Sequence, residues 1–383
     1  MEKNDISVLV CDDSALMRNL IGKIVENAEG LTLAGKAMNG RFALEKLPRL
    51  KPDVIVLDLE MPEMNGIEFL KERKKRNIET PVVILSSVAR KGAEVTMEAL
   101  SLGASDFIMK PSDTNRSDLS EIADNIVKTL LAYGHKYKNT KPPEGRLEAP
   151  APPPVTAVSG AVKARPETSK YTVDKKKEAF PEVNKNRRIT SSVELVVIGI
   201  STGGPNALRE VFKNIDPKLS LPVLVVQHMP AGFTEEFARS LDRICPLSVK
   251  EAAEGDILAP GRVLIARGNT HLTVEKKRLA SVAHLDDSDL VNGHRPSAGV
   301  LFASAGEAYG EKILGVIMTG MGKDGAREIG SLYNRGAITI GQDEESSIVY
   351  GMPRVAYEAG YIDYQLPLTD IAGKISEIVR ELG

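Results

Sequence analysis

The chain has 383 residues, 42% of them hydrophobic, which exceeds one ordinary domain and is enough to fill two cores. Its 50 basic and 52 acidic side chains leave a formal net charge of -2, so overall charge attracts it neither to nucleic acid nor to an anionic membrane. The sequence has no signal-peptide core and no apolar stretch long enough to span a bilayer, and its two cysteines, Cys11 and Cys245, lie far apart. These features predict a cytoplasmic protein with reduced core thiols.

In the first third of the chain, short β-branched runs alternate with helical patterns. Five strands and five helices of this kind predict an α/β domain over residues 1–135, with a parallel, doubly wound, flavodoxin-like sheet. The ligand site of such a sheet lies at the carboxyl ends of its strands. The predicted strands are Ile6 to Cys11, Leu31 to Ala37, Asp53 to Asp58, Pro81 to Ser86 and Ser105 to Met109.

Three carboxylates follow or end two of these strands. Asp12 and Asp13 come directly after the first strand, and Asp58 ends the third, so all three should meet at one edge of the sheet. Three negative groups in one pocket repel one another, and Mg²⁺ would relieve this repulsion through oxygen ligands. The ion would also neutralise charge during phosphoryl transfer to Asp58.

A hydroxyl and an ammonium are expected at the same edge. Ser86 ends the fourth strand and Lys110 follows the fifth, which makes both plausible phosphate ligands. A cis peptide before Pro111 could aim Lys110 inward. Taken singly, Asp12 or Asp13 could cap a helix, Asp58 could be a turn residue and Lys110 a solvated charge. Their joint occurrence at four strand ends favours a phosphorylation site.

From about Lys136 to Ser192 the sequence is rich in proline and lysine and has no sustained apolar periodicity. Structureless loops longer than about 15 residues are uncommon inside a compact domain. The pattern therefore predicts a flexible linker over residues 136–191 and a second domain over residues 192–383.

The second domain opens with an apolar strand ending near Ile198, followed by a glycine-rich turn that carries Ser201 and then by a helix. This arrangement could present Ser201 as a nucleophile, with backbone N-H groups at the helix start ready to bind an oxyanion. The same turn could instead bind a phosphate or simply connect two elements.

A base and an acid follow two other apolar strands. His228 ends the strand that begins near Leu221 and could take the serine proton, while Asp324 lies in the loop after Met318 and could orient the imidazole. Alone, Asp324 could equally cap the next helix. His294 is the rival base, whereas His135 borders the linker, and His271 and His284 are interpreted as surface or turn residues beside an antiparallel hairpin. The order Ser, His, Asp differs from that of the α/β-hydrolases, so that fold is not assumed.

Residues 5 to 133 resemble a two-component receiver domain. The resemblance implies that Asp58 is the phosphoacceptor and that Phe107 is the aromatic residue that reorients when Ser86 moves toward the phosphate. The matching motifs are Cys11-Asp12-Asp13-Ser14, Asp58-Leu59-Glu60-Met61-Pro62, Ser86-Ser87 and Lys110-Pro111.

The whole chain resembles the chemotaxis protein-glutamate methylesterase (CheB) family, through its receiver-linker-esterase order and its second-domain motifs. The resemblance implies a Rossmann-like three-layer esterase domain with a triad of Ser201, His228 and Asp324 and backbone oxyanion donors at Met321 and Thr202. Two departures, Ala298-Gly299 and Arg267, are expected to alter the substrate groove without contacting the triad. Further matches are Gln227-His228-Met229-Pro230, Pro296-Ser297, Gly341-Gln342-Asp343-Glu344 and Gly351-Met352-Pro353-Arg354.

The resemblance implies a phosphorylation-activated serine hydrolase that demethylates glutamyl methyl esters of chemoreceptors and deamidates receptor glutamines, without a cofactor for the esterase step. A chemotaxis histidine kinase would donate the phosphoryl group to Asp58, and the unphosphorylated receiver would cover Ser201. Membrane contact would occur only through receptors. Two alternatives remain: a binding module whose glycine turn holds a phosphate, and a transcription factor, which lacks a concentrated basic recognition helix.

Overall fold

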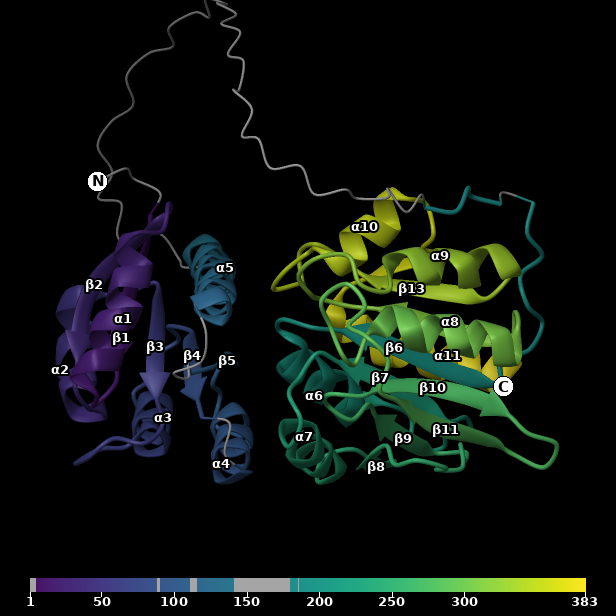
Figure 1. Ribbon diagram of the computed structural model, residues 1–383, viewed down its shortest axis with the longest axis horizontal. Coiled ribbons are helices and arrows are strands. Elements are labelled where there is room, and N and C mark those ends of the chain that lie inside the picture. Colours follow the sequence, from purple (N-terminus) through teal and green to yellow (C-terminus); the bar gives the residue numbers. More distant parts are fainter. Residues whose placement is uncertain (1–4, 88–89, 111–115, 141–179, 185) are drawn as a thin grey trace, which may run out of the picture.

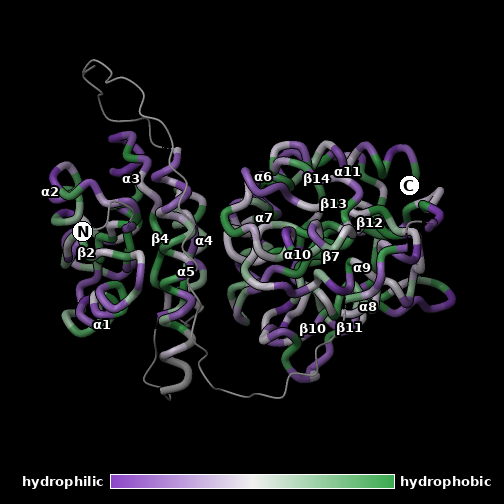
Figure 2. The backbone as a smooth tube through the Cα atoms, turned by 90° about the horizontal axis from the view of Figure 1, so that it is seen from above, coloured by the Kyte–Doolittle hydropathy of each residue, from purple (hydrophilic) through white to green (hydrophobic). Residues whose placement is uncertain are grey.

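The structure is a computed structural model that describes residues 5–87, 90–110, 116–140, 180–184 and 186–383. It contains two α/β domains that lie side by side, each built on its own parallel sheet (Figure 1). Seen from above, hydrophobic segments concentrate in the strands inside the domains (Figure 2).

The first domain has the predicted alternation of strands and helices. Its five-stranded parallel sheet has the order β2-β1-β3-β4-β5, so the order in which strands are added switches from one side of β1 to the other. In such sheets ligands bind at this switch point, outside the carboxyl ends of β1 and β3. The five predicted strands are confirmed, three of them beginning one residue later than expected. The elements are β1 (Ile6–Cys11), α1 (Ala15–Glu26), β2 (Leu31–Ala37), α2 (Gly40–Leu50), β3 (Val54–Asp58), α3 (Gly66–Lys75), β4 (Val82–Ser86), α4 (Arg90–Ser101), β5 (Asp106–Met109) and α5 (Arg116–Thr140).

The second domain is a three-layer structure around a seven-stranded sheet with the order β14-β13-β12-β6-β7-β9-β8, and all its paired strands are parallel. A separate antiparallel hairpin, β10-β11, is also present, as predicted. The elements are β6 (Leu195–Ile200), α6 (Gly204–Asn214), β7 (Val223–Gln227), α7 (Phe233–Asp242), β8 (Ser248–Glu251), β9 (Arg262–Ile265), β10 (His271–Lys276), β11 (Ser281–Asp286), α8 (Ala298–Tyr309), β12 (Ile313–Ile317), α9 (Ala326–Arg335), β13 (Ile338–Gln342), α10 (Met352–Glu358), β14 (Tyr364–Leu366) and α11 (Leu368–Leu382).

The central strand β6 shows why this sheet is covered on both faces. Every residue of β6 is buried, and alternate side chains enter two different cores. Val196 and Ile198 pack in the core that includes residues of α6, α7 and α11, whereas Leu195 and Val197 pack in the core with α8 and α9. Because both faces are buried, the loops that carry Ser201, His228 and Asp324 are left at the carboxyl edge of the sheet.

The ends of the predicted linker belong to the folded domains. Helix α5 continues to Thr140, beyond the predicted boundary at residue 135, and its last turns still contact the first domain: Thr80 Oγ1 donates to the Tyr137 hydroxyl at 3.3 Å, and Lys138 Nζ donates to the carbonyl of Asp5 at 3.1 Å. Residues 180–184 and 186–191 attach to the second domain: Asn184 N-H donates to Asn334 Oδ1 at 2.8 Å, and Arg187 pairs with Asp363. The remainder of the predicted linker, residues 141–179, lies outside the described residues.

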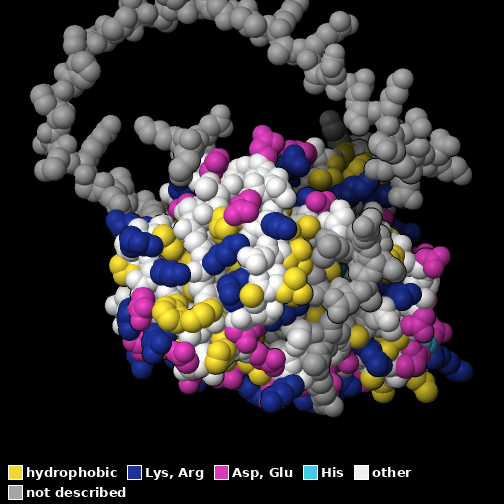
Figure 3. Space-filling model, turned by 60° about the vertical axis from the view of Figure 1, so that its left-hand side comes forward, with side chains coloured by type: hydrophobic (Ala, Val, Ile, Leu, Met, Phe, Trp, Pro, Cys, Tyr) yellow, Lys and Arg dark blue, Asp and Glu magenta, His cyan; other side chains and the backbone are white. Residues whose placement is uncertain are grey.

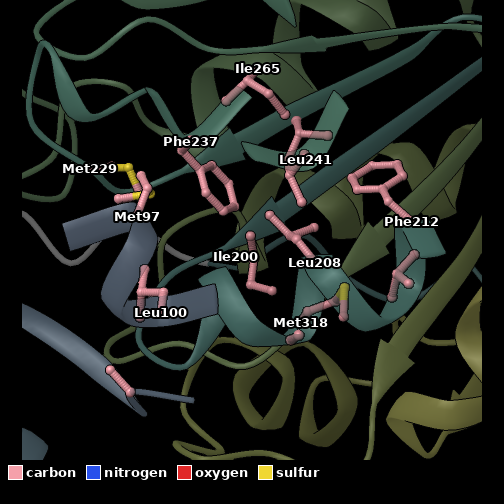
Figure 4. Close-up of a cluster of buried hydrophobic side chains, with 14 of the residues drawn as sticks. Met97, Leu100, Ile200, Leu208, Phe212, Met229, Phe237, Leu241, Ile265 and Met318 are labelled. Carbon is pink, nitrogen blue, oxygen red and sulfur yellow. The ribbon is translucent and has the colours of Figure 1, made fainter. Parts of the chain in front are cut away.

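The two domains meet through α4, β5 and α5 of the first domain. Met97 and Leu100 of α4 belong to the same buried cluster as Met229 and Phe237 of the second domain (Figure 4). On the face that Figure 3 turns toward the viewer, Lys and Arg side chains are interspersed with Asp and Glu. Among the described residues, no helix is both long enough and apolar enough to span a bilayer.

Candidate active site

Ser201, His228 and Asp324 lie together at the carboxyl edge of the second sheet. Ser201 follows β6, His228 follows β7, and Asp324 lies in the loop after β12. His228 Nδ1 is 3.0 Å from Ser201 Oγ, and His228 Nε2 is 2.8 Å from Asp324 Oδ2. These three predicted residues therefore form one continuous chain of hydrogen bonds. The serine and the aspartate are 123 positions apart in the sequence.

The chain of hydrogen bonds determines which imidazole nitrogen carries the proton. An ionised carboxylate only accepts hydrogen bonds, so Nε2-H of His228 must donate to Asp324. Nδ1 is then the unprotonated nitrogen, and it faces the hydroxyl of Ser201. This is the state in which His228 can act as a base toward the serine.

Asp324 is held as a carboxylate although its residue is only 1% exposed. Burial alone would favour the neutral acid, but hydrogen bonds and charge from His228, together with hydrogen bonds from Ser297 and Asn292, hold the pKa of Asp324 well below its usual range. Ser297 Oγ donates to Asp324 Oδ1 at 2.6 Å, and Asn292 Nδ2 donates to the same oxygen at 3.0 Å.

The first amides of α8 also donate to this carboxylate, so the prediction that Ala298 and Gly299 do not contact the triad is wrong. Ala298 N-H donates to Asp324 Oδ2 at 2.7 Å, and Gly299 N-H lies 3.4 Å from Oδ1. These are backbone contacts at a helix N-terminus, where a negative charge is favoured whatever the side chain. A Cβ at position 299 would also come within 2.8 Å of Glu328 Oε2. Arg267 is exposed.

Two other histidines lie near the triad. His271 was interpreted as a surface or turn residue, but it is fully buried at the start of β10, because Nε2 reaches the carbonyl of Asp289 and Nδ1 accepts from Ser297 N-H. His294 stacks on His228 with ring centroids 3.8 Å apart and planes 14° apart. Burial, helped by the nearby His228, lowers the pKa of His294 to about 4, so it stays neutral near pH 7. His228, not its rival, contacts Ser201.

The expected oxyanion donors border Ser201. Thr202 and Met321 line the same cavity as Ser201, and their N-H groups make no hydrogen bond to any described residue. The Met321 loop approaches the serine closely, since a Cβ at Gly320 would come within 2.8 Å of Ser201 Cβ. Both amides are therefore available to a substrate oxygen beside Ser201.

The cavity at Ser201 lies between the two domains and has a volume of about 670 Å³. Its second-domain wall includes Ser201, His228 and Met321, and its first-domain wall includes Asn125 and Thr129 of α5. Since a first-domain helix forms one wall, the route by which a large substrate reaches Ser201 is narrowed in this arrangement.

A second candidate site lies in the first domain, at the carboxyl ends of β1 and β3. Asp12, Asp13 and Asp58 place carboxylate oxygens within 4.8 Å of one another. Lys110 Nζ is 2.6 Å from Asp58 Oδ2 and 3.4 Å from Asp12 Oδ2. Burial raises the pKa of Asp58, although Lys110 opposes this effect. Pro111 lies outside the described residues, so the suggested cis peptide remains a prediction.

The two other residues that were predicted to respond to phosphorylation, Ser86 and Phe107, lie beside the acidic pocket and at the domain interface, respectively. Ser86 Oγ is 2.7 Å from Thr96 Oγ1 of α4, a buried contact beside Asp58. Phe107 of β5 points across the interface and stacks on Phe233 of α7, with centroids 5.0 Å apart and planes 6° apart. Its neighbour Asp106 accepts a hydrogen bond at 2.9 Å from Gly203 N-H, two residues beyond Ser201.

Comparisons with known proteins match both domains of the chain. The family described as CheB methylesterase matches residues 196–375, and the response regulator receiver domain matches residues 8–122. A protein-glutamate methylesterase/protein-glutamine glutaminase of Treponema denticola is 53% identical over 98% of this chain and 99% of its own length. The chain belongs to this methylesterase family. The Treponema pallidum relative of the same name is 49% identical over 97% of each chain.

Two solved domains of the CheB protein of Thermotoga maritima are also similar. Its methylesterase catalytic domain is 41% identical, with a TM-score of 0.48, and the match covers 49% of this chain and 99% of that domain. Its response regulator domain is 39% identical, with a TM-score of 0.31, and the match covers 36% of this chain and 99% of that domain.

The acidic pocket of this CheB family member fits a hard divalent cation. Asp12 Oδ2 is buried, and apart from its ion pair with Lys110 at 3.4 Å it receives no hydrogen bond from the described residues, so it retains lone pairs for an ion. Asp13 is exposed, which leaves room for water on one side of the pocket. Carboxylates and water are the ligands that Mg²⁺ prefers.

Four residues that support Ser201 or Asp324 were not predicted to do so from the sequence. Ser297, Asn292 and His271 support Asp324 directly or through one another, and Gln227 Nε2 donates to the carbonyl of Ser201 at 3.0 Å. Ser297 and Gln227 were part of family motifs, which was the only available signal. Asn292 and His271 had none, because their contacts join loops far apart in sequence.

Proposed function

We propose that the protein is a phosphorylation-activated serine hydrolase that removes methyl groups from glutamyl methyl esters of chemoreceptors, in chemotaxis adaptation. The observation that carries this proposal is the hydrogen-bonded chain from Ser201 through His228 to Asp324. The names of relatives that align over nearly the whole chain support the ester and amide substrates. We extend the proposal to deamidation of receptor glutamines, because ester and amide share a tetrahedral oxyanion intermediate.

In the proposed reaction, Ser201 Oγ attacks the γ-carbonyl carbon of the glutamyl ester while His228 Nδ1 takes the serine proton. The carbonyl oxygen becomes an oxyanion that the N-H groups of Thr202 and Met321 stabilise. His228 then returns the proton to the leaving methoxide, which departs as methanol. Water, activated by His228, hydrolyses the acyl-serine and restores the free enzyme. Asp324 stabilises the imidazolium that forms in each half-reaction.

For regulation, we propose that a chemotaxis histidine kinase supplies the phosphoryl group to Asp58. Asp12, Asp13 and Asp58 would hold Mg²⁺, which neutralises charge on the transferred group. The acyl phosphate formed on Asp58 would carry roughly two negative charges in place of the one on the carboxylate, and Lys110 and Ser86 could bind its oxygens. Movement of Ser86 would let Phe107 turn inward and give up its stacking on Phe233, which would loosen the interface over Ser201.

This proposal is tested by methanol release from methylated receptors, with and without a small-molecule phosphodonor. Ser201→Ala should lower kcat by at least about 10⁴-fold under both conditions, because the nucleophile is missing. Asp58→Ala should keep the basal rate and lose the stimulation. Undiminished activity of Ser201→Ala would refute the assignment of the nucleophile, and a stimulated Asp58→Ala would refute the assignment of the phosphoacceptor.

A further inference from the structure

A lysine of the first domain occupies a backbone site in the second domain. Lys136 of α5 places its ammonium 3.1, 3.0 and 2.8 Å from the carbonyl oxygens of Glu345, Ser346 and Ser347. We call these three carbonyls the carbonyl cup. An ammonium carries three N-H donors that can spread over three acceptors, so the cup satisfies it completely. The adjoining segment Asp343-Glu344-Glu345 adds negative charge. Burial lowers the pKa of Lys136, and the carboxylates of Asp343 and Glu345 partly oppose this effect.

The second domain builds the carbonyl cup without help from α5. Asp343 Oδ1 accepts from Ser346 N-H at 2.9 Å and from Ser346 Oγ at 2.6 Å, and Ser347 Oγ donates to the Asp343 carbonyl at 2.6 Å. The amides of Ile348 and Val349 both donate to Thr319 Oγ1 at 3.1 Å. The cup therefore stays formed when the domains separate.

The carbonyl cup is also tied to the esterase site. The carbonyl of Val349 accepts from Gly320 N-H at 3.0 Å, and Gly320 directly precedes Met321. A group bound in the cup thus lies on the same rigid loop system as the oxyanion donor.

Lys136 lies on the same face of α5 as part of the wall of the Ser201 cavity. Asn125 and Thr129 are two of the five α5 residues that line that cavity, and Lys136 follows them by 11 and seven residues. Because each residue of an α-helix turns by about 100°, Asn125 and Thr129 point to within about 20° of the direction of Lys136. Lys136 lies about 10 to 16 Å further along the helix axis than these two residues. In this arrangement α5 spans the distance from the nucleophile to the carbonyl cup with a single helical face.

We propose that the carbonyl cup is a substrate subsite: after α5 leaves, it binds the ammonium of a lysine on the receptor helix, seven or 11 residues C-terminal to the glutamyl ester. The inference rests on the proposed function, in which the ester is presented on a helix. The receptor helix must reach Ser201 through the opening that α5 occupies in the closed form. The position of Lys136 shows that the carbonyl cup accepts a lysine side chain. An arginine fits less well, because its planar guanidinium directs its donors as a fork rather than toward three converging carbonyls.

The test uses the full chain with a saturating phosphodonor and synthetic α-helical hairpins that each carry one glutamyl γ-methyl ester. Lysine is placed seven, nine or 11 residues C-terminal to the ester, and alanine or arginine replaces it at position seven. Offset nine points to the opposite side of the helix and is the matched control. We expect lysine at seven or 11 to lower KM about ten-fold relative to alanine, with kcat nearly unchanged.

The protein side of the test is Glu345→Lys, which places a positive charge beside the carbonyl cup without changing its backbone. The exposed Glu307 on α8 offers a control, Glu307→Lys, with the same change in net charge. The readout is the ratio of kcat/KM between lysine and alanine hairpins, which does not depend on the fraction of enzyme in the open form. Glu345→Lys should reduce this ratio to about one, and Glu307→Lys should preserve it.

Three results would overturn the inference: equal kcat/KM for lysine and alanine hairpins with the wild type, an equal benefit at offset nine, or a ratio that survives Glu345→Lys. In each of these cases the hairpins are still hydrolysed, so the proposed esterase function stands. Hydrolysis of none of the hairpins would instead contradict the proposed function itself.

Discussion

Asp106 of the first domain is a buried carboxylate that accepts a hydrogen bond from the second domain. It is enclosed by Gly203 N-H, Phe107 N-H and the hydroxyl of Tyr133, and burial raises its pKa to about 6. Separation of the domains exposes the carboxyl and returns its pKa toward the ordinary value of about 4. The closed form therefore binds a proton more tightly than the open form.

The sign of the pH effect follows from this difference. Closure gains stability as pH falls from about 6 to about 4, and loses it as pH rises through about 6, with a change of up to about 100-fold in the closed-to-open ratio. Energy transfer between fluorophores on the two domains of the unphosphorylated protein would measure this ratio. Asp106→Asn should abolish the pH dependence over that window, and an unchanged profile in the variant would show that another group is responsible.

Strand β5 of the first domain contacts helix α7 of the second through the stacked rings of Phe107 and Phe233. Aromatic pairs of this geometry contribute about 0.5 to 1.5 kcal/mol beyond burial. Phe107→Leu retains an apolar side chain but loses the stacking, so unphosphorylated activity should rise by about two- to ten-fold. Steady-state methanol release measures the effect. The phosphorylated rate serves as the control and should stay the same, whereas a fall in both rates would indicate general damage to the fold.

At the scale of the whole molecule, the segment before β6 belongs to the esterase domain. Arg187 pairs with Asp363, donates to the carbonyl of Ala337 at 2.7 Å and stacks over Tyr333 at 3.7 Å from the ring centroid. Tyr361 also donates to the carbonyl of Pro181. A fragment that starts at Ser192 loses these contacts, whereas one that starts at Phe180 keeps them.

Both fragments should hydrolyse receptor esters faster than the unphosphorylated full chain, because α5 no longer forms a wall of the Ser201 cavity. The shorter fragment should melt about 5 °C or more below the longer one, since it loses a paired and partly buried arginine. Activity assays and thermal unfolding check the two parts separately. Fragments that are no faster than the full chain would contradict autoinhibition, and equal melting temperatures would show that residues 180–191 contribute no stability.

The sequence alone predicts the two α/β domains, the five strands of the first, and the strands that bring Ser201, His228 and Asp324 together, because apolar runs locate strands and parallel strands end at one edge. The positions of Asp12, Asp13 and Asp58 at strand ends predicted the acidic pocket in the same way. The sequence did not predict β8, β9, β13 or β14 of the second sheet. Only the tertiary structure decided that His228 faces the serine through Nδ1, that the Ala298 amide supports Asp324, and that Lys136 enters a carbonyl cup. The physical reason is that these contacts use particular ring nitrogens and backbone groups from distant loops, which leave no periodicity in the sequence.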